Sequence, residues 1–271
     1  MEFIKALILG IIQGITEWLP VSSTGHLLLA DEFCKLGGGK SFVDMFMVVI
    51  QFGSILAVVT LYFHKLNPFS PKKSSLEKKQ TWTMWFKVLA ATIPAGVAGI
   101  LLDDWISANA HQWYVIAAAL IVYGILFIVL ENRNNKPNIN SMNDMSYKTA
   151  VLIGCFQMLS LIPGTSRSGS TILGAVFLGT SRAVAAEFSF FLAIPVMIGA
   201  SGLKIAKYVL KSGFAFPHLS VLIFGTVVAY LVSLAAIKFL MGYIRKHDFK
   251  AFGWYRIILG IVVILYFSIF A

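Results

Sequence analysis

Residues 13–26 read QGITEWLPVSSTGH and bring an acid, hydroxyls and an imidazole together inside an apolar stretch. Gln13 and Glu17 are four residues apart, so a helix that ends near Pro20 places both side chains on one face. Because its neighbours are apolar, the Glu17 carboxylate needs a cation, a hydrogen-bond network or a proton. The polar residues that follow are Ser22, Ser23, Thr24 and His26. The stretch predicts a nucleophile beside an acid; the simpler alternative is a helix cap next to a carboxylate solvated at a membrane interface.

Residues 163–171 read PGTSRSGST and centre on a permanently charged group, Arg167. The planar fork of its guanidinium matches the oxygens of a phosphate. The glycines let the backbone approach a bound anion closely, and the helix that follows would direct its N-terminus at that anion. The surrounding small and polar residues are Gly164, Thr165, Ser166, Ser168, Gly169, Ser170 and Thr171. We expect an anion-binding loop; the alternative is an Arg167 neutralised by Glu17 or Glu187 for structural reasons alone.

Together the two stretches would support transfer of a phosphoryl group to water. Either Ser23 attacks with His26 as base and later acid, or His26 attacks while the serines orient the phosphate, and the residue types leave both routes open. Glu17, with Gln13, would hold a divalent cation that bridges phosphate oxygens, or Glu17 would accept a proton. A single carboxylate is a small ligand set, so we expect such a metal to be shared with the substrate.

The rest of the chain indicates where this chemistry takes place. Of the 271 residues 58% are hydrophobic and 13% are charged, and the mean hydropathy is +0.81. This composition predicts an all-α integral membrane protein. Six helices are expected to span the bilayer, at about residues 43–63, 85–102, 113–130, 184–203, 219–241 and 254–271. A site among spans favours a lipid phosphate, such as a polyprenyl diphosphate, that enters laterally from the bilayer.

Two further apolar stretches, residues 3–30 and 149–179, are each interrupted by one of the polar motifs. The interruptions are too polar to face lipid, and their flanks are too apolar for a solvent loop. Irregular backbone at membrane depth is tolerated only inside protein or beside a watery cavity. Both stretches are therefore predicted to be re-entrant helix-loop-helix hairpins.

The two halves of the chain also resemble each other. Pro20 and Pro163 are 143 positions apart, as are Ser23 and Ser166. We expect a single membrane domain, residues 1–271, built of two repeats at about 1–135 and 145–271, with the second copy inverted because each copy crosses the membrane three times. In this alignment Thr24 takes the place of Arg167. Upstream of the prolines the alignment slips by one residue, so GIIQ at Gly10 matches GCFQ at Gly154, and Leu161 takes the place of Glu17. If the hairpin tips meet, Glu17, Ser23, His26 and Arg167 surround one point.

Lysine and arginine predict the orientation. The loops after the first, third and fifth spans are rich in these residues and should be cytoplasmic, which leaves both termini extracytoplasmic. The net charge of +10 is then explained by topology and anionic lipid headgroups, and no nucleic-acid partner is expected.

With these motifs the chain resembles the bacitracin-resistance family of undecaprenyl-diphosphate phosphatases. That family is marked by an acid or glutamine, three residues and a glutamate leading into LPVSSTGH, and by PGxSRSxxT in the second half; both patterns are present here. The resemblance implies an enzyme of the bacterial plasma membrane that hydrolyses undecaprenyl diphosphate at a site open to the extracytoplasmic face. It also implies an interdigitated inverted-repeat fold and dependence on a divalent cation such as Mg²⁺ or Ca²⁺, held through Glu17.

Carried over by position, Glu17, Ser23, His26 and Arg167 take the catalytic places. The residues expected to bind substrate are Gln13, Ser22, Thr24, Gly164, Thr165, Ser166, Ser168 and Thr171. Some members of the family have glutamate where this chain has Gln13, which weakens a metal or acid role there. Two alternatives stay open: a lipid flippase or anion transporter on the same scaffold, and a homodimer formed through the glycine-rich spans.

Overall fold

The structure, a computed structural model, describes residues 1–110, 112–133, 136–212 and 219–270. Within these ranges the regular structure is helical apart from one isolated bridge between Ile139 and Thr180. The helices are α1 (Glu2–Thr16), α2 (Ser23–Phe33), α3 (Lys40–Leu61), α4 (Phe63–Leu66), α5 (Ser75–Asn109), α6 (Trp113–Asn132), α7 (Tyr147–Met158), the 3₁₀ turn η1 (Leu159–Leu161), α8 (Arg167–Phe177), α9 (Arg182–Ser212), α10 (Leu219–Tyr243) and α11 (Lys250–Phe270). The predicted all-α class is confirmed.

The six predicted membrane spans are also confirmed. α3, α5, α6, α9, α10 and α11 are each long and apolar enough to cross a bilayer. The expected end of the last span, Ala271, lies outside the described residues. Many large apolar side chains on these helices are exposed, for example Ile100 at 83%. Such an apolar exterior is typical of a surface that lipid covers.

α5 begins earlier than the hydropathy predicts, at Ser75 instead of residue 85. The cause is a capping box in the lysine-rich loop. The Ser74 hydroxyl accepts a hydrogen bond from the Glu77 amide at 3.3 Å, and the Glu77 carboxylate accepts one from the Ser74 amide at 2.7 Å. Because this cap satisfies two free amides, the helix extends beyond the apolar stretch that the sequence indicated.

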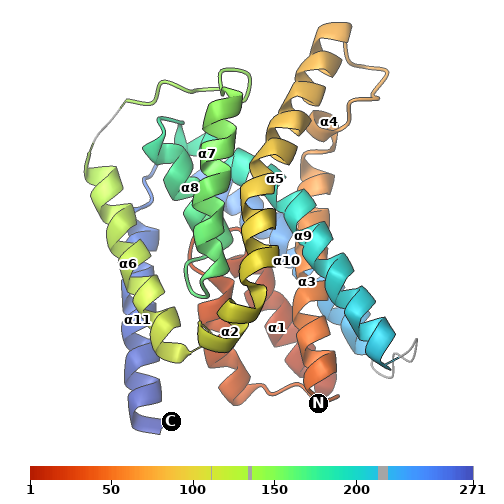
Figure 1. The fold of residues 1–271 in the computed structure, drawn as a ribbon, viewed down its shortest axis with the longest axis vertical. Helices are drawn as coiled ribbons and strands as arrows, with labels where there is room; N and C mark the ends of the chain where they lie inside the picture. The colour runs from red at the N-terminus through yellow and green to blue at the C-terminus, as the bar shows by residue number, and fades with distance from the viewer. Residues whose placement is uncertain (111, 134–135, 213–218, 271) are drawn as a thin grey trace.

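Two pairs of short helices carry the polar motifs. α1 rises from the N-terminus at the lower end of Figure 1, the chain turns after Trp18, and α2 follows. α7 begins at the opposite, upper end, turns through η1, and leads into α8. The turns of both pairs lie between their helices and carry Pro20 and Pro163. We call these turns, residues 17–22 and 159–166, the first and second tips.

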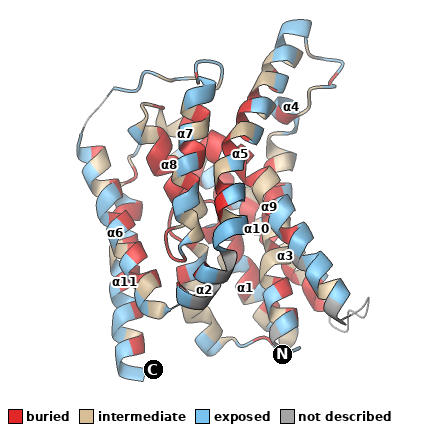
Figure 2. Cartoon of the chain, viewed as in Figure 1, coloured by how far each residue is buried: buried red, intermediate tan, exposed pale blue. Residues whose placement is uncertain are grey.

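The long helices surround the short pairs in an interleaved pattern. α1 packs on α10, whereas α7 packs on α5, and α3 pairs with α9 as α6 pairs with α11. The closest approach needs glycine: a Cβ at Gly154 of α7 would lie 2.1 Å from the Ala91 carbonyl oxygen of α5. Figure 2 shows that buried residues face the middle of the bundle, which is where the tips lie. There Trp18 is fully buried and packs edge-on against Phe190, with ring centroids 5.3 Å apart.

Candidate active site

The two tips meet in an ion pair between a carboxylate and a guanidinium. Arg167, the first residue of α8, donates from Nη2 to Glu17 Oε1 at 3.2 Å. Glu17 is the C-cap of α1. The side chains are 10% and 5% exposed, so the pair is shielded from water. From the sequence we expected both residues at one point if the tips met, with neutralisation of Arg167 by Glu17 as the structural alternative. The structure brings the two residues together and pairs them.

Glu17 accepts hydrogen bonds from three donors. Besides the bond to Arg167, its Oε2 accepts from Gln13 Nε2 at 2.8 Å and from Ser23 Oγ at 3.4 Å. The Gln13 contact is the i, i+4 pairing that the sequence indicated. The Gln13 Oε1 atom is buried and has no hydrogen-bond partner. The carboxylate is therefore held in place, and it lies beside both a hydroxyl and a cation.

Arg167 is held on its other side by α9. Its Nη1 donates to the Ser189 carbonyl oxygen at 2.8 Å, and the Ser189 hydroxyl lies 2.6 Å from that of Thr171. The guanidinium carbon is also 5.5 Å from the centre of the Trp18 ring. Buried Nε has no partner. These contacts hold the guanidinium of Arg167 in place, and Ser189 was not among the residues that the sequence motifs indicated.

The two serine caps have the same unusual backbone. Ser22 and Ser166 have φ values of 72° and 70°, which non-glycine residues seldom adopt. Each side chain accepts a hydrogen bond from the amide three residues later, that of Gly25 at 3.3 Å and that of Gly169 at 3.1 Å. Because these caps are 144 positions apart, Arg167 occupies the place of Ser23. The sequence alignment differs by one residue, since it matched Arg167 to Thr24.

Most hydroxyls of the second motif are bonded to the backbone of the tips. Ser168 donates to the Glu17 carbonyl oxygen at 3.0 Å, and Thr165 donates to those of Leu159 and Ile162. Ser170 and Thr171 likewise donate to carbonyl oxygens one helical turn before them. Gly164 has a φ of 94°. In this structure the motif's hydroxyls hold the tips together and shape the loop around Arg167.

His26 lies at the edge of the site and has two hydrogen-bond partners. Its Nδ1 is 2.7 Å from the Ser22 carbonyl oxygen, and its Nε2 is 2.7 Å from the Tyr255 hydroxyl. A carbonyl oxygen only accepts, so Nδ1 carries a proton, and in the neutral imidazole Nε2 accepts from Tyr255. The rings are stacked, with centroids 5.6 Å apart. Tyr255 of α11 was not predicted, and Thr24 is exposed.

Comparison with known proteins agrees with these motifs. A family model described as "Bacitracin resistance protein BacA" matches residues 6–262. The chain belongs to this family. The undecaprenyl-diphosphatase of Limosilactobacillus fermentum is 60% identical over 274 residues, which cover 100% of this chain and 99% of that relative.

Other relatives in the BacA family are similar over nearly their whole length. The undecaprenyl-diphosphatase of Enterococcus faecalis is 58% identical over 265 residues, covering 97% of this chain and 96% of the relative. Undecaprenyl-diphosphatase 1 of Clostridioides difficile is 60% identical over 269 residues, covering 98% and 97%. Family membership and the six apolar helices together identify a multi-pass membrane protein.

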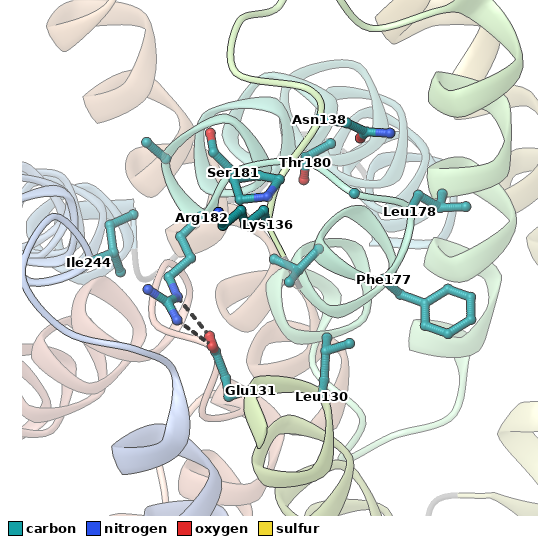
Figure 3. Close-up of a pocket in the computed structure, with 14 residues that line it drawn as sticks. Leu130, Glu131, Lys136, Asn138, Phe177, Leu178, Thr180, Ser181, Arg182 and Ile244 are labelled. Atoms are coloured by element: carbon teal, nitrogen blue, oxygen red, sulfur yellow. Dashed lines mark hydrogen bonds and ion pairs between the residues drawn. The ribbon is translucent and has the colours of Figure 1, made fainter. Parts of the chain in front are cut away.

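A cavity of about 740 Å³ lies elsewhere in this BacA family member, among residues 130–131, 136–138, 176–183 and Ile244 (Figure 3). Its wall contains a bidentate ion pair in which Arg182 Nε donates to Glu131 Oε1 at 2.9 Å. The Phe249 amide donates to the same oxygen at 3.1 Å. Glu131 therefore joins the ends of α6, α9 and α11. No residue of the two tips lines this cavity, so the chemistry predicted from the sequence does not belong to it.

Proposed function

We propose that this BacA family member hydrolyses undecaprenyl diphosphate to undecaprenyl phosphate and inorganic phosphate. The single observation that carries the proposal is the meeting of Arg167 with Glu17, with Ser23 on the other carboxylate oxygen. A guanidinium that binds phosphate, a carboxylate and a hydroxyl at one buried point are the groups that phosphoryl transfer uses. The relatives named undecaprenyl-diphosphatase support this choice of substrate.

In the proposed reaction the guanidinium of Arg167 gives up part of its hydrogen bonding to Glu17 and donates instead to the oxygens of the terminal phosphate. Ser23 Oγ then attacks the terminal phosphorus, and its proton passes to Glu17, which already accepts its hydrogen bond. The bond from phosphorus to the bridging oxygen breaks, and undecaprenyl phosphate leaves. Water next attacks the phosphoserine, the bond from phosphorus to Oγ breaks, and Glu17 returns its proton to Oγ. The protons of the water leave with inorganic phosphate, so both Ser23 and Glu17 are regenerated.

His26 is the alternative nucleophile that the sequence left open. Its attacking nitrogen would be Nε2, which accepts a hydrogen bond from Tyr255, so the tyrosine must first move. Ser23 needs no such movement, since its hydrogen bond already points to a base. We therefore favour Ser23 as nucleophile with Glu17 as base, and we assign His26 to orienting phosphate or to proton transfer at the second step.

A divalent cation fits the site in part. Among the described residues there is no group of three or more His, Cys, Asp or Glu side chains. The oxygen atoms on offer are the Glu17 carboxylate and the unpartnered Gln13 Oε1, which suit Mg²⁺ or Ca²⁺. Glu17 and Gln13 would hold such an ion together with the diphosphate oxygens. The ion would supply charge neutralisation at the phosphate.

We further propose that the two short helix pairs are re-entrant hairpins of an inverted repeat. The interleaved packing supports this, since α1 on α10 in one half corresponds to α7 on α5 in the other. The matched caps at Ser22 and Ser166 support it as well. With the lysine-rich loops cytoplasmic, both termini are extracytoplasmic, and the site opens to that face. There it would recycle the lipid carrier of cell-wall synthesis, which accounts for bacitracin resistance.

The test is phosphate release from a polyprenyl diphosphate by the purified protein in detergent. We expect turnover by the wild type and by Arg182→Lys, and its loss in Ser23→Ala and Arg167→Ala, with folding checked by thermal unfolding. Arg182 is the matched control because it also pairs with a buried carboxylate, Glu131, away from the tips. Vectorial movement of lipid or anion without phosphate release would instead support a transporter. Turnover of Arg167→Ala near that of the wild type would refute the proposed site.

A further inference from the structure

Arg256 of α11 is the other arginine at the tips, and its side chain is completely buried. The ion pairs among the described residues do not include it. A buried guanidinium without a carboxylate partner is costly unless other groups satisfy it. Its guanidinium carbon lies 5.4 Å from the centre of the Tyr123 ring, and its remaining polar partners are backbone carbonyl oxygens. Such an arginine needs a functional explanation.

These carbonyl oxygens belong to both tips. Arg256 Nη1 donates to the Pro20 carbonyl oxygen of the first tip at 3.2 Å. Its Nη2 donates to the carbonyl oxygens of Gly164 at 2.9 Å and Thr165 at 3.0 Å, which belong to the second tip. Pro20 lies in the first half of the sequence, whereas Gly164 and Thr165 are neighbours in the second half. A fourth acceptor, the Ala119 carbonyl oxygen of α6, lies 3.5 Å from Nη2. One side chain therefore links the turn before Ser23 to the turn before Arg167.

The planar fork explains why arginine suits this place. Its donors are fixed in one plane, so it can satisfy carbonyl oxygens from two segments at once, whereas a lysine ammonium is a compact point charge. The carbonyl groups direct the negative ends of their dipoles at the guanidinium of Arg256. Without this cation, their negative potential at the two tips would oppose the binding of an anion there. The positive charge of Arg256 offsets this negative potential in a region from which water is excluded.

We propose that Arg256 is a positioning residue of the phosphatase site, an inference that rests on the proposed function. It holds the two tips in the register in which Arg167 meets Glu17 and Ser23. It also offsets the dipoles of the carbonyl groups at the two tips. It does not touch the reacting atoms, and its effect on turnover passes through Arg167.

The fold has other means of joining the tips and α11, so a variant of Arg256 should still fold. Ser168 of the second motif donates to the carbonyl oxygens of Glu17 at 3.0 Å and Leu19 at 3.3 Å. α11 is packed along α6 through Gly124 and Gly253, whose Cβ atoms would lie within 2.8 Å of the facing carbonyl oxygens. The loss of Arg256 therefore changes the register of the tips more than it changes the bundle.

The experiment compares wild type, Arg256→Lys, Arg167→Lys and the double variant in phosphate release from a polyprenyl diphosphate. We expect Arg256→Lys to lower kcat at least tenfold with a smaller change in KM and a small change in Tm. Arg182→Lys, which loses a guanidinium bound to Glu131 away from the tips, should keep wild-type kcat. In the double variant the two losses should not multiply, because Arg256 acts through Arg167.

Turnover of Arg256→Lys within twofold of the wild type would overturn the inference, as would losses that multiply in the double variant. If Arg256→Lys yields no folded protein, phosphate release by Gly169→Ala tests the inference instead. A Cβ there would lie 3.0 Å from Arg256 Nη1 and 3.1 Å from Ser166 Cβ. The variant would therefore displace the Arg256 guanidinium while retaining its charge, and it would also contact the Ser166 cap. A tenfold fall in kcat supports the inference, and unchanged turnover overturns it. A wild type that releases no phosphate overturns the proposed function, whereas an active wild type with an unaffected Arg256→Lys overturns the inference alone.

Discussion

Substitution of Glu17 by glutamine tests the centre of the site with almost no change in shape. All three groups that contact the carboxylate are donors: Gln13 Nε2, Ser23 Oγ and Arg167 Nη2. A glutamine side chain offers only one acceptor oxygen, and its amide group is itself a donor. In every orientation of Glu17→Gln, at least one donor therefore faces the amide nitrogen. Arg167 also loses the countercharge with which it is buried.

Two different magnitudes follow for Glu17→Gln. Breaking a buried ion pair by removing one partner costs about 3–5 kcal/mol of folding free energy. Loss of a general base lowers turnover on the order of 10²- to 10⁴-fold, which corresponds to about 3–5 kcal/mol of activation barrier. The first effect lowers Tm and the yield of folded protein. The second persists in the protein that is folded, so the two are separable.

The assay is phosphate release per mole of folded protein, with thermal unfolding measured on the same sample. Glu131→Gln is the matched control, because that carboxylate is equally buried at 5% and also pairs with an arginine. It should lose stability but keep its kcat, whereas Glu17→Gln should lose both. If Glu17→Gln retains turnover within about fivefold of the wild type, Glu17 is not the base, and the route through Ser23 to Glu17 is wrong.

Three further predictions follow from single contacts. Tyr255→Phe removes the donor to His26 Nε2 and should reduce turnover by no more than about tenfold, as expected for one hydrogen bond; a loss equal to that of His26→Ala would instead give Tyr255 a direct role. Chelation of divalent cations should abolish phosphate release. Gln13→Glu adds a carboxylate and should therefore lower the Mg²⁺ concentration that gives half-maximal activity. If that concentration is the same as for the wild type, Gln13 is not a ligand of the cation. Gly154→Ala should lower the free energy of unfolding by about 1–3 kcal/mol because the new Cβ would press on Ala91. Gly199→Ala is the control and should leave stability unchanged, since its Cβ would meet no atom within 4 Å. Equal Tm values for the two variants would contradict the packing of α7 on α5.

The spans and the two residues of the central ion pair could be identified from sequence for the same physical reason. Polar groups at membrane depth are costly, so apolar stretches define the helices, and polar interruptions stand out against them. Glu17 and Arg167 were conspicuous on this ground, and the structure joins them. The early start of α5 was missed because a capping box acts on backbone amides, which hydropathy does not register.

Tyr255 and Arg256 were missed for a different reason. Aromatic and basic residues near the start of a span are usually interfacial anchors, so their types gave no signal. Only the packing of α11 on α6 distinguishes an interfacial anchor from a residue of the site, since it turns Arg256 into the bundle and directs Tyr255 to His26. Contacts between residues more than 200 positions apart in sequence cannot be read from local spacing.

The two serine caps have the same conformation, but a different residue follows each of them, and this difference makes the site asymmetric. Ser22 and Ser166 adopt the same left-handed conformation and cap their helices in the same way, so the residue after each is delivered to an equivalent place. In the first half that residue is Ser23, and in the second it is Arg167. Two serines would provide a nucleophile with no cation for the phosphate, and two arginines would provide repulsion with no nucleophile. The repeated backbone, with serine after one cap and arginine after the other, therefore supplies both a nucleophile and a cation. Glu17 contacts these two side chains through its two oxygens.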